Sequence, residues 1–224
     1  MRNAERPTPS VERVYDRRFS SAEAARKSVV WQELGRYLQR FVPPAAVVVD
    51  VACDRGDFIA NVEAAEKWAT DVRDVSHHLP DEVHFVQADG LSLDDHLPNA
   101  HFDLAFMSNY LEHLPSGDAV ILQLEAVSRL LKPGGRLLIL QPNIRLTGAA
   151  YWDFIDHNVA LTERSLVEAA ELSGYETEKL ITRFLPYTTK SRFPQTRFLV
   201  RAYLALRPAW LVLGKQTLYV GRRR

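Results

Sequence analysis

The stretch VVVDVACDRGDF, from Val47 to Phe58, decides how the chain is expected to fold. It opens with three valines, which suit a buried strand, and continues through Asp50 into a short turn. A buried strand that leads directly into such a turn is typical of an open α/β sheet, in which ligands bind beyond the carboxyl ends of the strands. The end of this first strand is therefore where a binding site is expected.

Short apolar runs alternate with amphipathic stretches on the C-terminal side of this turn. The predicted strands are residues 47–52, 67–71, 83–88, 102–108, 136–141, 175–183 and 215–221. The predicted helices are residues 57–66, 118–131 and 162–173, with short turns near 75–78 and 91–96. Strands that alternate with helices predict a mostly parallel sheet sandwiched by helices.

The segments on either side of this core have a different character. Residues 1–44 are expected to form an N-terminal helical cap, since apolar residues recur at helical intervals up to Phe41 and two prolines follow. The core is predicted over residues 45–184. Residues 185–214 form a basic, apolar and helical insertion, and residues 215–224 form the last strand and tail. We expect a single domain over residues 1–224.

Composition is ordinary for a soluble globular protein, with 46% hydrophobic and 25% charged residues. The only cysteine is Cys53, so no intramolecular disulfide can form. The first residues lack the apolar segment of a secretory signal, and no apolar run is long enough for a transmembrane helix. The composition predicts a cytoplasmic protein.

Charge is unevenly distributed along the chain although the net charge is zero. Residues 181–224 contain ten Lys and Arg residues and no Asp or Glu. Such segregation indicates either a basic solvated tail or a surface for a partner. An acceptor that carries phosphate or a lipid, or contact with a membrane surface, would explain these cations and the apolar residues among them.

The turn after the first strand indicates the charge of its ligand. A dinucleotide site would place glycines at Ala52 and Asp54 so that the backbone could approach a pyrophosphate. The Asp54 carboxylate would instead repel a phosphate, at a cost of a few kcal/mol. An NAD(P)-dependent oxidoreductase is therefore the least favoured function, and a cationic cofactor without phosphate is favoured.

Three motifs resemble those of class I S-adenosyl-L-methionine (SAM)-dependent methyltransferases, particularly small bacterial enzymes of biosynthetic clusters. Asp50-Val-Ala52-Cys-Asp54-Arg-Gly56 corresponds to the family pattern D/E-x-G-x-G-x-G, with Ala52 and Asp54 in place of two glycines. MSNYLEHLP (107–115) resembles the segment beneath the cofactor, and LKPGGRLLILQPN (131–143) resembles the helix, turn and fifth strand. The resemblance implies a Rossmann-like sheet of seven strands whose last strand is antiparallel.

The resemblance also implies the residues that contact SAM. Asp71, at the end of the second strand, is expected to bind the ribose hydroxyls, and Asp89 the adenine amino group. Each of these acids, and Asp50, has an alternative role as a cap or turn residue. The full predicted cofactor set is Asp50, Ala52, Cys53, Asp54, Gly56, Phe58, Asp71, Val72, Asp89, Gly90, Ser108, Asn109 and His113.

Methyl transfer to a hydroxyl needs a general base near the transferring methyl group. His113 is the first candidate and His157 its rival, and each has an alternative structural role. Residues 143–158 follow the fifth strand and combine aromatic and polar groups suited to a small molecule. The predicted acceptor-binding residues are Tyr110, Asn143, Tyr151, Trp152 and Asp156. The acids and histidine of this stretch match no strong metal signature, and no metal is expected.

The sequence thus predicts a SAM-dependent methyltransferase. Its favoured reaction is O-methylation of a small molecule such as a sugar or secondary metabolite. The alternative is a catalytically degenerate SAM-binding protein with a regulatory or structural role, suggested by Ala52 and Asp54. Nucleic acid is not an expected partner, because the fourth strand does not end in the NPPY-like element used on a flipped base. The sequence does not distinguish a monomer from a homodimer.

Overall fold

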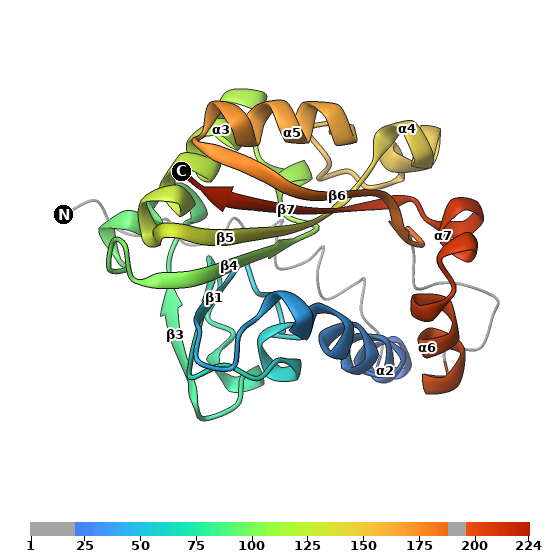
Figure 1. The fold of residues 1–224 in the computed structure, drawn as a ribbon, viewed down its shortest axis with the longest axis horizontal. Coiled ribbons are helices and arrows are strands. Elements are labelled where there is room, and N and C mark those ends of the chain that lie inside the picture. Colours follow the sequence, from blue (N-terminus) through green and yellow to red (C-terminus); the bar gives the residue numbers. More distant parts are fainter. Residues whose placement is uncertain (1–20, 188–195) are drawn as a thin grey trace.

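A seven-stranded sheet runs through the computed structural model, which describes residues 21–187 and 196–224 (Figure 1). The strands are β1 (Val47–Val51), β2 (Glu66–Asp71), β3 (Val83–Gln87), β4 (Phe102–Ser108), β5 (Leu131–Pro142), β6 (Tyr175–Leu185) and β7 (Gln216–Arg223). Their order is β3-β2-β1-β4-β5-β7-β6, and β7 is antiparallel to both of its neighbours. The predicted Rossmann-like sheet with an antiparallel last strand is confirmed.

Helices cover both faces of the sheet (Figure 1). They are α2 (Ser21–Leu38), α3 (Gly117–Leu130), α4 (Ile144–Thr147), α5 (Glu163–Leu172), α6 (Arg197–Ala205) and α7 (Arg207–Leu213). One apolar cluster joins the sheet to α3 and α5, and a second joins its other face to α2, α6 and α7. None of the described helices is both long enough and apolar enough to cross a bilayer.

The predicted helix over residues 57–66 is wrong, since that segment contains only a 3₁₀ turn, Ile59–Asn61. The Asn61 side chain donates to the Asp57 carbonyl (2.8 Å), and Val62 already has extended backbone angles. Helix α2 packs here instead: a Cβ on Gly35 would lie 2.4 Å from the Asn61 carbonyl oxygen. The N-terminal cap therefore takes the place of the expected helix beside β1.

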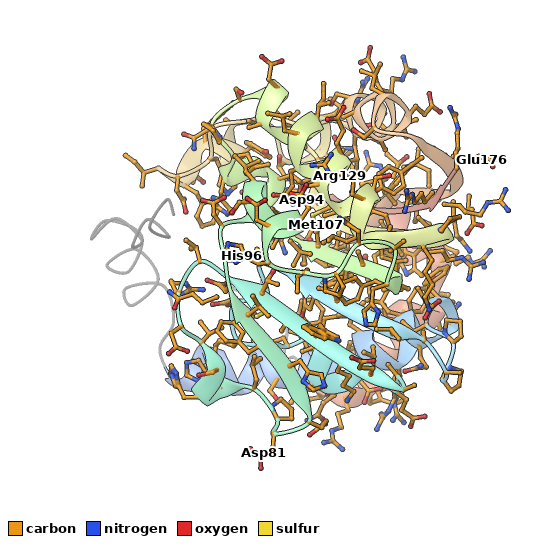
Figure 2. The ribbon with its side chains drawn as sticks, turned by 90° about the vertical axis from the view of Figure 1, so that its left-hand side faces the viewer. Asp81, Asp94, His96, Met107, Arg129 and Glu176 are labelled. Carbon is orange, nitrogen blue, oxygen red and sulfur yellow. The ribbon has the colours of Figure 1, made fainter. Side chains whose placement is uncertain are left out.

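The other predicted element boundaries differ less from those of the structure. Strand β5 begins at Leu131, five residues before the predicted start, because the chain leaves α3 directly into the sheet. The insertion is helical as predicted and forms α6 and α7, whereas Lys190 and Arg192 lie outside the described residues. Arg129 of α3 donates to Asp94 (2.7 Å), which ties α3 to the 3₁₀ segment Gly90–Asp95 (Figure 2).

The topology defines one functional edge of the sheet. Strands β1, β2, β3, β4 and β5 are parallel, so their carboxyl ends lie at the same edge. Pro142, at the end of β5, pairs with Gln216, at the start of β7. Helix α4 follows β5 and α7 precedes β7, so both helices also lie at this edge (Figure 1).

Candidate active site

The turn after β1 keeps the backbone conformation of a glycine-rich loop. Ala52, Asp54 and Gly56 have φ angles of 54°, 51° and 69°, in the left-handed region. These are the three positions at which the predicted motif carries glycine. Two non-glycine residues therefore hold strained backbone angles, which cost roughly 1–2 kcal/mol each. Strain of this kind persists where the surrounding structure enforces it, often at a binding site.

Asp50, in β1 just before this turn, is buried in the protein. Its side chain is 3% exposed and accepts a hydrogen bond from the Ile59 amide. Burial raises the pKa of Asp50 well above its usual value, the Ile59 amide opposes that rise, and Asp57, Asp71 and Asp54 add to it. A buried carboxyl surrounded by acids is a favourable position for a cation.

Two cations neutralise the acids around the turn. Lys27 of α2 lies 3.1 Å from Asp54 and 2.9 Å from Asp57, and Arg73 lies 3.0 Å from Asp54. Burial alone would raise the pKa of Asp54, but Lys27 and Arg73 hold it below its usual value. The aspartate that replaces a glycine is thus an ion-pair centre that joins α2 to the turn.

The predicted ribose-binding acid, Asp71, is 6% exposed at the end of β2. It accepts hydrogen bonds from the Asp54 amide (3.0 Å), the Arg73 amide (2.9 Å) and the Arg73 guanidinium (3.0 Å). A ribose at Asp71 would therefore have to share this carboxylate with the Arg73 side chain or displace it.

Asp89 and Tyr110 lie together beyond β3 and β4. Asp89 caps the segment that follows it by accepting from the Leu91 amide (2.8 Å), which is the alternative role considered for this acid. A Cβ on Gly90 would lie 2.0 Å from the Tyr110 hydroxyl, which donates to Gln123 (2.8 Å). Tyr110, a predicted acceptor-binding residue, therefore packs beside the predicted adenine position.

The remaining predicted cofactor residues differ in accessibility. The Phe58 side chain, predicted to contact the cofactor, is 1% exposed and stacks on Phe106 at 3.8 Å in the core. Cys53 is also buried. Asn109 is exposed beyond the end of β4, has a φ of 49° and donates to Ser108 (2.9 Å). Val72 and Ser108 are half-buried at strand ends, where a ligand can reach them.

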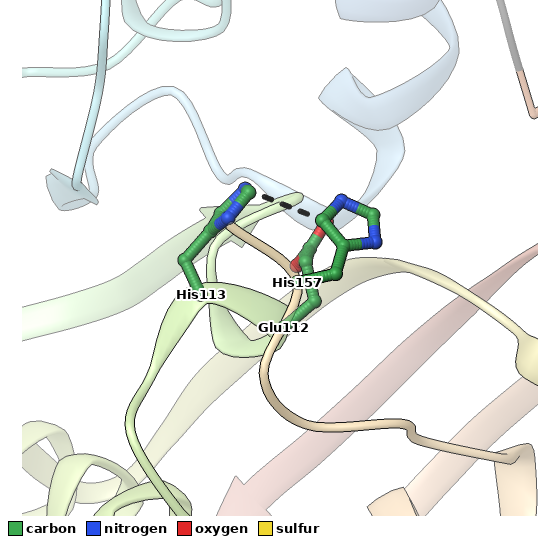
Figure 3. Close-up of side chains that lie close together, drawn as sticks. All are labelled: Glu112, His113 and His157. Atoms are coloured by element: carbon green, nitrogen blue, oxygen red, sulfur yellow. Dashed lines mark ion pairs between the residues drawn. The ribbon is translucent and has the colours of Figure 1, made fainter. Parts of the chain in front are cut away.

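The two histidines proposed as rival bases lie side by side, although His113 follows β4 and His157 follows β5 and α4 (Figure 3). The rings of His113 and His157 are 5.0 Å apart and nearly perpendicular. His113 Nδ1 lies 2.9 Å from the Asp156 carbonyl oxygen and 3.2 Å from the Asp156 carboxylate. Because both neighbours are acceptors, Nδ1 carries the proton in the neutral ring, and Nε2 carries the lone pair.

Glu112 is the third member of this cluster, beside His113 and His157. It is 1% exposed, accepts from Gln141 (3.0 Å), and its carboxylate lies 4.0 Å from His113 Nε2. Burial raises the pKa of Glu112, which His113 and Gln141 oppose. One ligand atom each of Glu112, His113 and His157 lies within 4.8 Å of the others. Two ligands of one zinc ion are at most about 4.2 Å apart, so a metal would have to draw these groups together.

Two predicted acceptor-binding residues, Asn143 and Tyr151, are buried and make structural hydrogen bonds. Asn143 is 1% exposed and donates to Glu163 (2.7 Å) and Thr217 (3.1 Å). It also accepts from the Arg145 amide (3.0 Å) and so caps α4. Tyr151 is fully buried and donates to the Val159 carbonyl, which ties the two parts of the loop together.

Two members of the loop stay available to an acceptor. Trp152 is 52% exposed, and Asp156, partly exposed, holds His113. His157 is buried between Phe154, stacked at 5.0 Å, and the edge of Tyr151 at 4.8 Å. His157 therefore shapes the cluster, while the half-buried His113 is the histidine that a reactant can reach.

Sequence reasoning missed the residues that support these groups. Glu112 stands within the quoted SNYLEH segment, and Arg73 stands two residues after Asp71, yet neither was singled out. Glu112 directly precedes the candidate base His113 in the sequence, and this position was the available signal. Nothing in the local sequence signals Lys27, which is 27 residues away from Asp54.

Comparison with known proteins identifies relatives of this arrangement. A family model described as "Methyltransferase domain" matches residues 23–180. A ubiquinone/menaquinone biosynthesis C-methyltransferase, UbiE, from Pseudomonas putida is 32% identical over 119 residues, which are 52% of this chain and 44% of that protein. The chain thus aligns with less than half the length of this curated relative.

Solved structures share the fold at low sequence identity. A SAM-dependent methyltransferase from Mesorhizobium loti aligns with a TM-score of 0.59 at 19% identity, over 84% of this chain and 96% of its own. The geranyl diphosphate C-methyltransferase of Streptomyces coelicolor, solved with Mg²⁺, geranyl diphosphate and S-adenosyl-L-homocysteine, aligns with a TM-score of 0.57 at 14% identity. That alignment covers 85% of this chain and 80% of the other.

Proposed function

Since the chain belongs to the class I SAM-dependent methyltransferases, we propose that it methylates a hydroxyl group of a small molecule, such as a sugar or a secondary metabolite. The observation that carries the proposal is the orientation of His113, whose Nδ1 is held by Asp156 so that Nε2 is the basic nitrogen. A base of this kind is needed when a hydroxyl attacks, because the oxygen must lose its proton.

The residues around the β1 turn fit a cationic cofactor. The left-handed angles at Ala52, Asp54 and Gly56 bring backbone toward the ligand, and Asp50 and Asp71 supply carboxylates. When bound, SAM supplies an activated methyl group on a positive sulfur. The chain holds the two reactants in line, and His113 Nε2 accepts the proton of the acceptor hydroxyl.

The pair formed by His113 and Asp156 needs no metal for this role. Asp156 fixes the ring and stabilises the imidazolium that forms when Nε2 takes the proton. The buried Glu112 carboxyl lies 4.0 Å away on the Nε2 side. We therefore expect methyl transfer to continue in the presence of a chelator.

Methylation of carbon is the second candidate, because the P. putida relative is named a C-methyltransferase. The same base would remove a proton from an activated acceptor. The alternative of a degenerate binding protein is disfavoured by the turn, which keeps left-handed angles at both replaced glycines.

Transfer of a labelled methyl group tests the proposal. The protein is incubated with methyl-labelled SAM, a chelator and a panel of sugars and phenols, including phosphate-bearing and lipid-linked ones. NMR of the product locates the label. Label on oxygen supports the proposal, label on carbon supports the second candidate, and binding of S-adenosyl-L-homocysteine without transfer to any acceptor or to lysate would contradict both.

A further inference from the structure

Helices α6 and α7 and the residue between them carry a group of exposed apolar side chains, called here the α6–α7 surface. Six of the twelve large apolar side chains exposed in the described residues belong to it. They are Phe198, Leu199, Leu206, Leu211, Val212 and Leu213, with exposures between 43% and 77%. This concentration on two short helices is more than the scattered exposure expected of a protein surface.

The opposite side of these helices is anchored, so the apolar side chains are held outward by the fold. Leu204 and Trp210 are buried in the apolar cluster formed by α2 and one face of the sheet. The Tyr203 hydroxyl donates to the Phe184 carbonyl (2.6 Å), and the Trp210 indole donates to the Tyr203 carbonyl (2.8 Å). Each helix is therefore fixed to the protein through part of its surface, while the apolar side chains of the α6–α7 surface stay exposed.

The charges around this surface are positive. Arg197, Arg207 and Lys215 are exposed beside the apolar residues, and the sequence has no acid between Ile181 and Arg224. Glu33 of α2 faces α6, is 2% exposed and is paired with Arg201 (2.5 Å) and Arg36 (2.7 Å). An apolar surface bordered by cations is complementary to a bilayer of anionic lipids.

The surface lies at the functional edge of the sheet. Gly214 ends α7, and Gln216 then pairs with Pro142 at the carboxyl end of β5, where α4 and the acceptor loop begin (Figure 1). We propose that the α6–α7 surface docks on an anionic lipid bilayer and turns the carboxyl edge of the sheet toward the membrane. This docking goes beyond the methyl-transfer proposal and is measured without any acceptor.

Vesicle sedimentation tests the proposal with the full chain. We expect the protein to bind phosphatidylglycerol vesicles more tightly than phosphatidylcholine vesicles, and to be released by high salt. Phe198→Ser with Leu211→Ser should weaken binding about tenfold or more, through lost apolar burial. Arg207→Gln with Lys215→Gln should weaken binding to the anionic vesicles by about fivefold for each cation removed.

Matched controls lie on α5, away from this surface. Leu172 is 66% exposed, and the Arg164 side chain is 82% exposed, so Leu172→Ser and Arg164→Gln make the same chemical changes elsewhere. Circular dichroism verifies that each variant folds. Absent binding to anionic vesicles, or equal loss in the α5 variants, would overturn the proposal. So would a homodimer, seen by light scattering, that Phe198→Ser with Leu211→Ser dissociates, because a second copy would then cover the surface.

Discussion

At the scale of single residues, the β1 turn combines backbone strain with concentrated negative charge. Ala52 and Asp54 hold left-handed angles, and Asp50 is buried among other acids. The positions of these acids followed from strand ends in the sequence. Their cationic partners did not, because ion pairs such as that of Asp54 with Lys27 depend on how α2 packs.

Ala52→Gly should stabilise the protein by several tenths of a kcal/mol up to about 1 kcal/mol. The substitution removes left-handed strain, partly offset by the greater flexibility of glycine in the unfolded chain. Ala60→Gly, within the 3₁₀ turn Ile59–Asn61, is the control and should destabilise by roughly 0.5–1 kcal/mol. Urea denaturation compares the two. A loss of stability in both variants would mean that φ at Ala52 carries no strain.

Cofactor binding should release a proton from Asp50. Its pKa is raised in the free protein, and a cationic ligand favours the charged carboxylate and lowers that pKa. Affinity for SAM is then full above the raised pKa and falls as pH decreases through it. Calorimetric titrations in buffers of different ionisation enthalpy measure the released proton. Asp50→Asn should abolish the release, and an unchanged release would assign it to another group.

At the scale of elements, α2 substitutes for the helix expected after β1. The apolar pattern over residues 57–66 predicted a helix, but Gly35 brings α2 against Asn61 and leaves no room for one. Local periodicity cannot reveal such a replacement, because it reports which residues are buried and not which element buries them. The predicted helices α3 and α5 were right because each begins at a side-chain cap, Ser116 for α3 and Thr162 for α5. Helix α5 also stops just before Gly174, whereas α3 runs directly into β5.

Lys27→Met should destabilise the protein by about 1–3 kcal/mol, because it leaves Asp54 and Asp57 partly buried with one cation fewer. Burial opposes the charge of Lys27, but Asp54 and Asp57 hold its pKa above the usual value. Lys67→Met is the matched control: Lys67 pairs at 3.4 Å with Glu82, whose side chain is 62% exposed, and should cost less than about 1 kcal/mol. Equal costs in thermal denaturation would argue against an ion-pair role for Lys27.

At the scale of the whole molecule, the turn acids and His113 lie at one edge of the sheet, because they follow the carboxyl ends of parallel strands. The fold and the strand-end acids could be predicted from the sequence, because alternation and motif spacing are local signals. Local signals could not tell which of residues 143–158 stabilise the loop and which belong to the site. Only tertiary contacts distinguish Asn143 and Tyr151, which stabilise the loop, from Asp156, which orients His113.

The single-turnover rate of methyl transfer by His113→Ala tests the central claim most directly. With saturating SAM and the acceptor found by label transfer, we predict a rate about 10²–10⁴-fold below wild type. Affinity for S-adenosyl-L-homocysteine should change far less. The control, His96→Ala, removes an exposed histidine (Figure 2) and should keep the wild-type rate. A rate unchanged in His113→Ala would contradict the account.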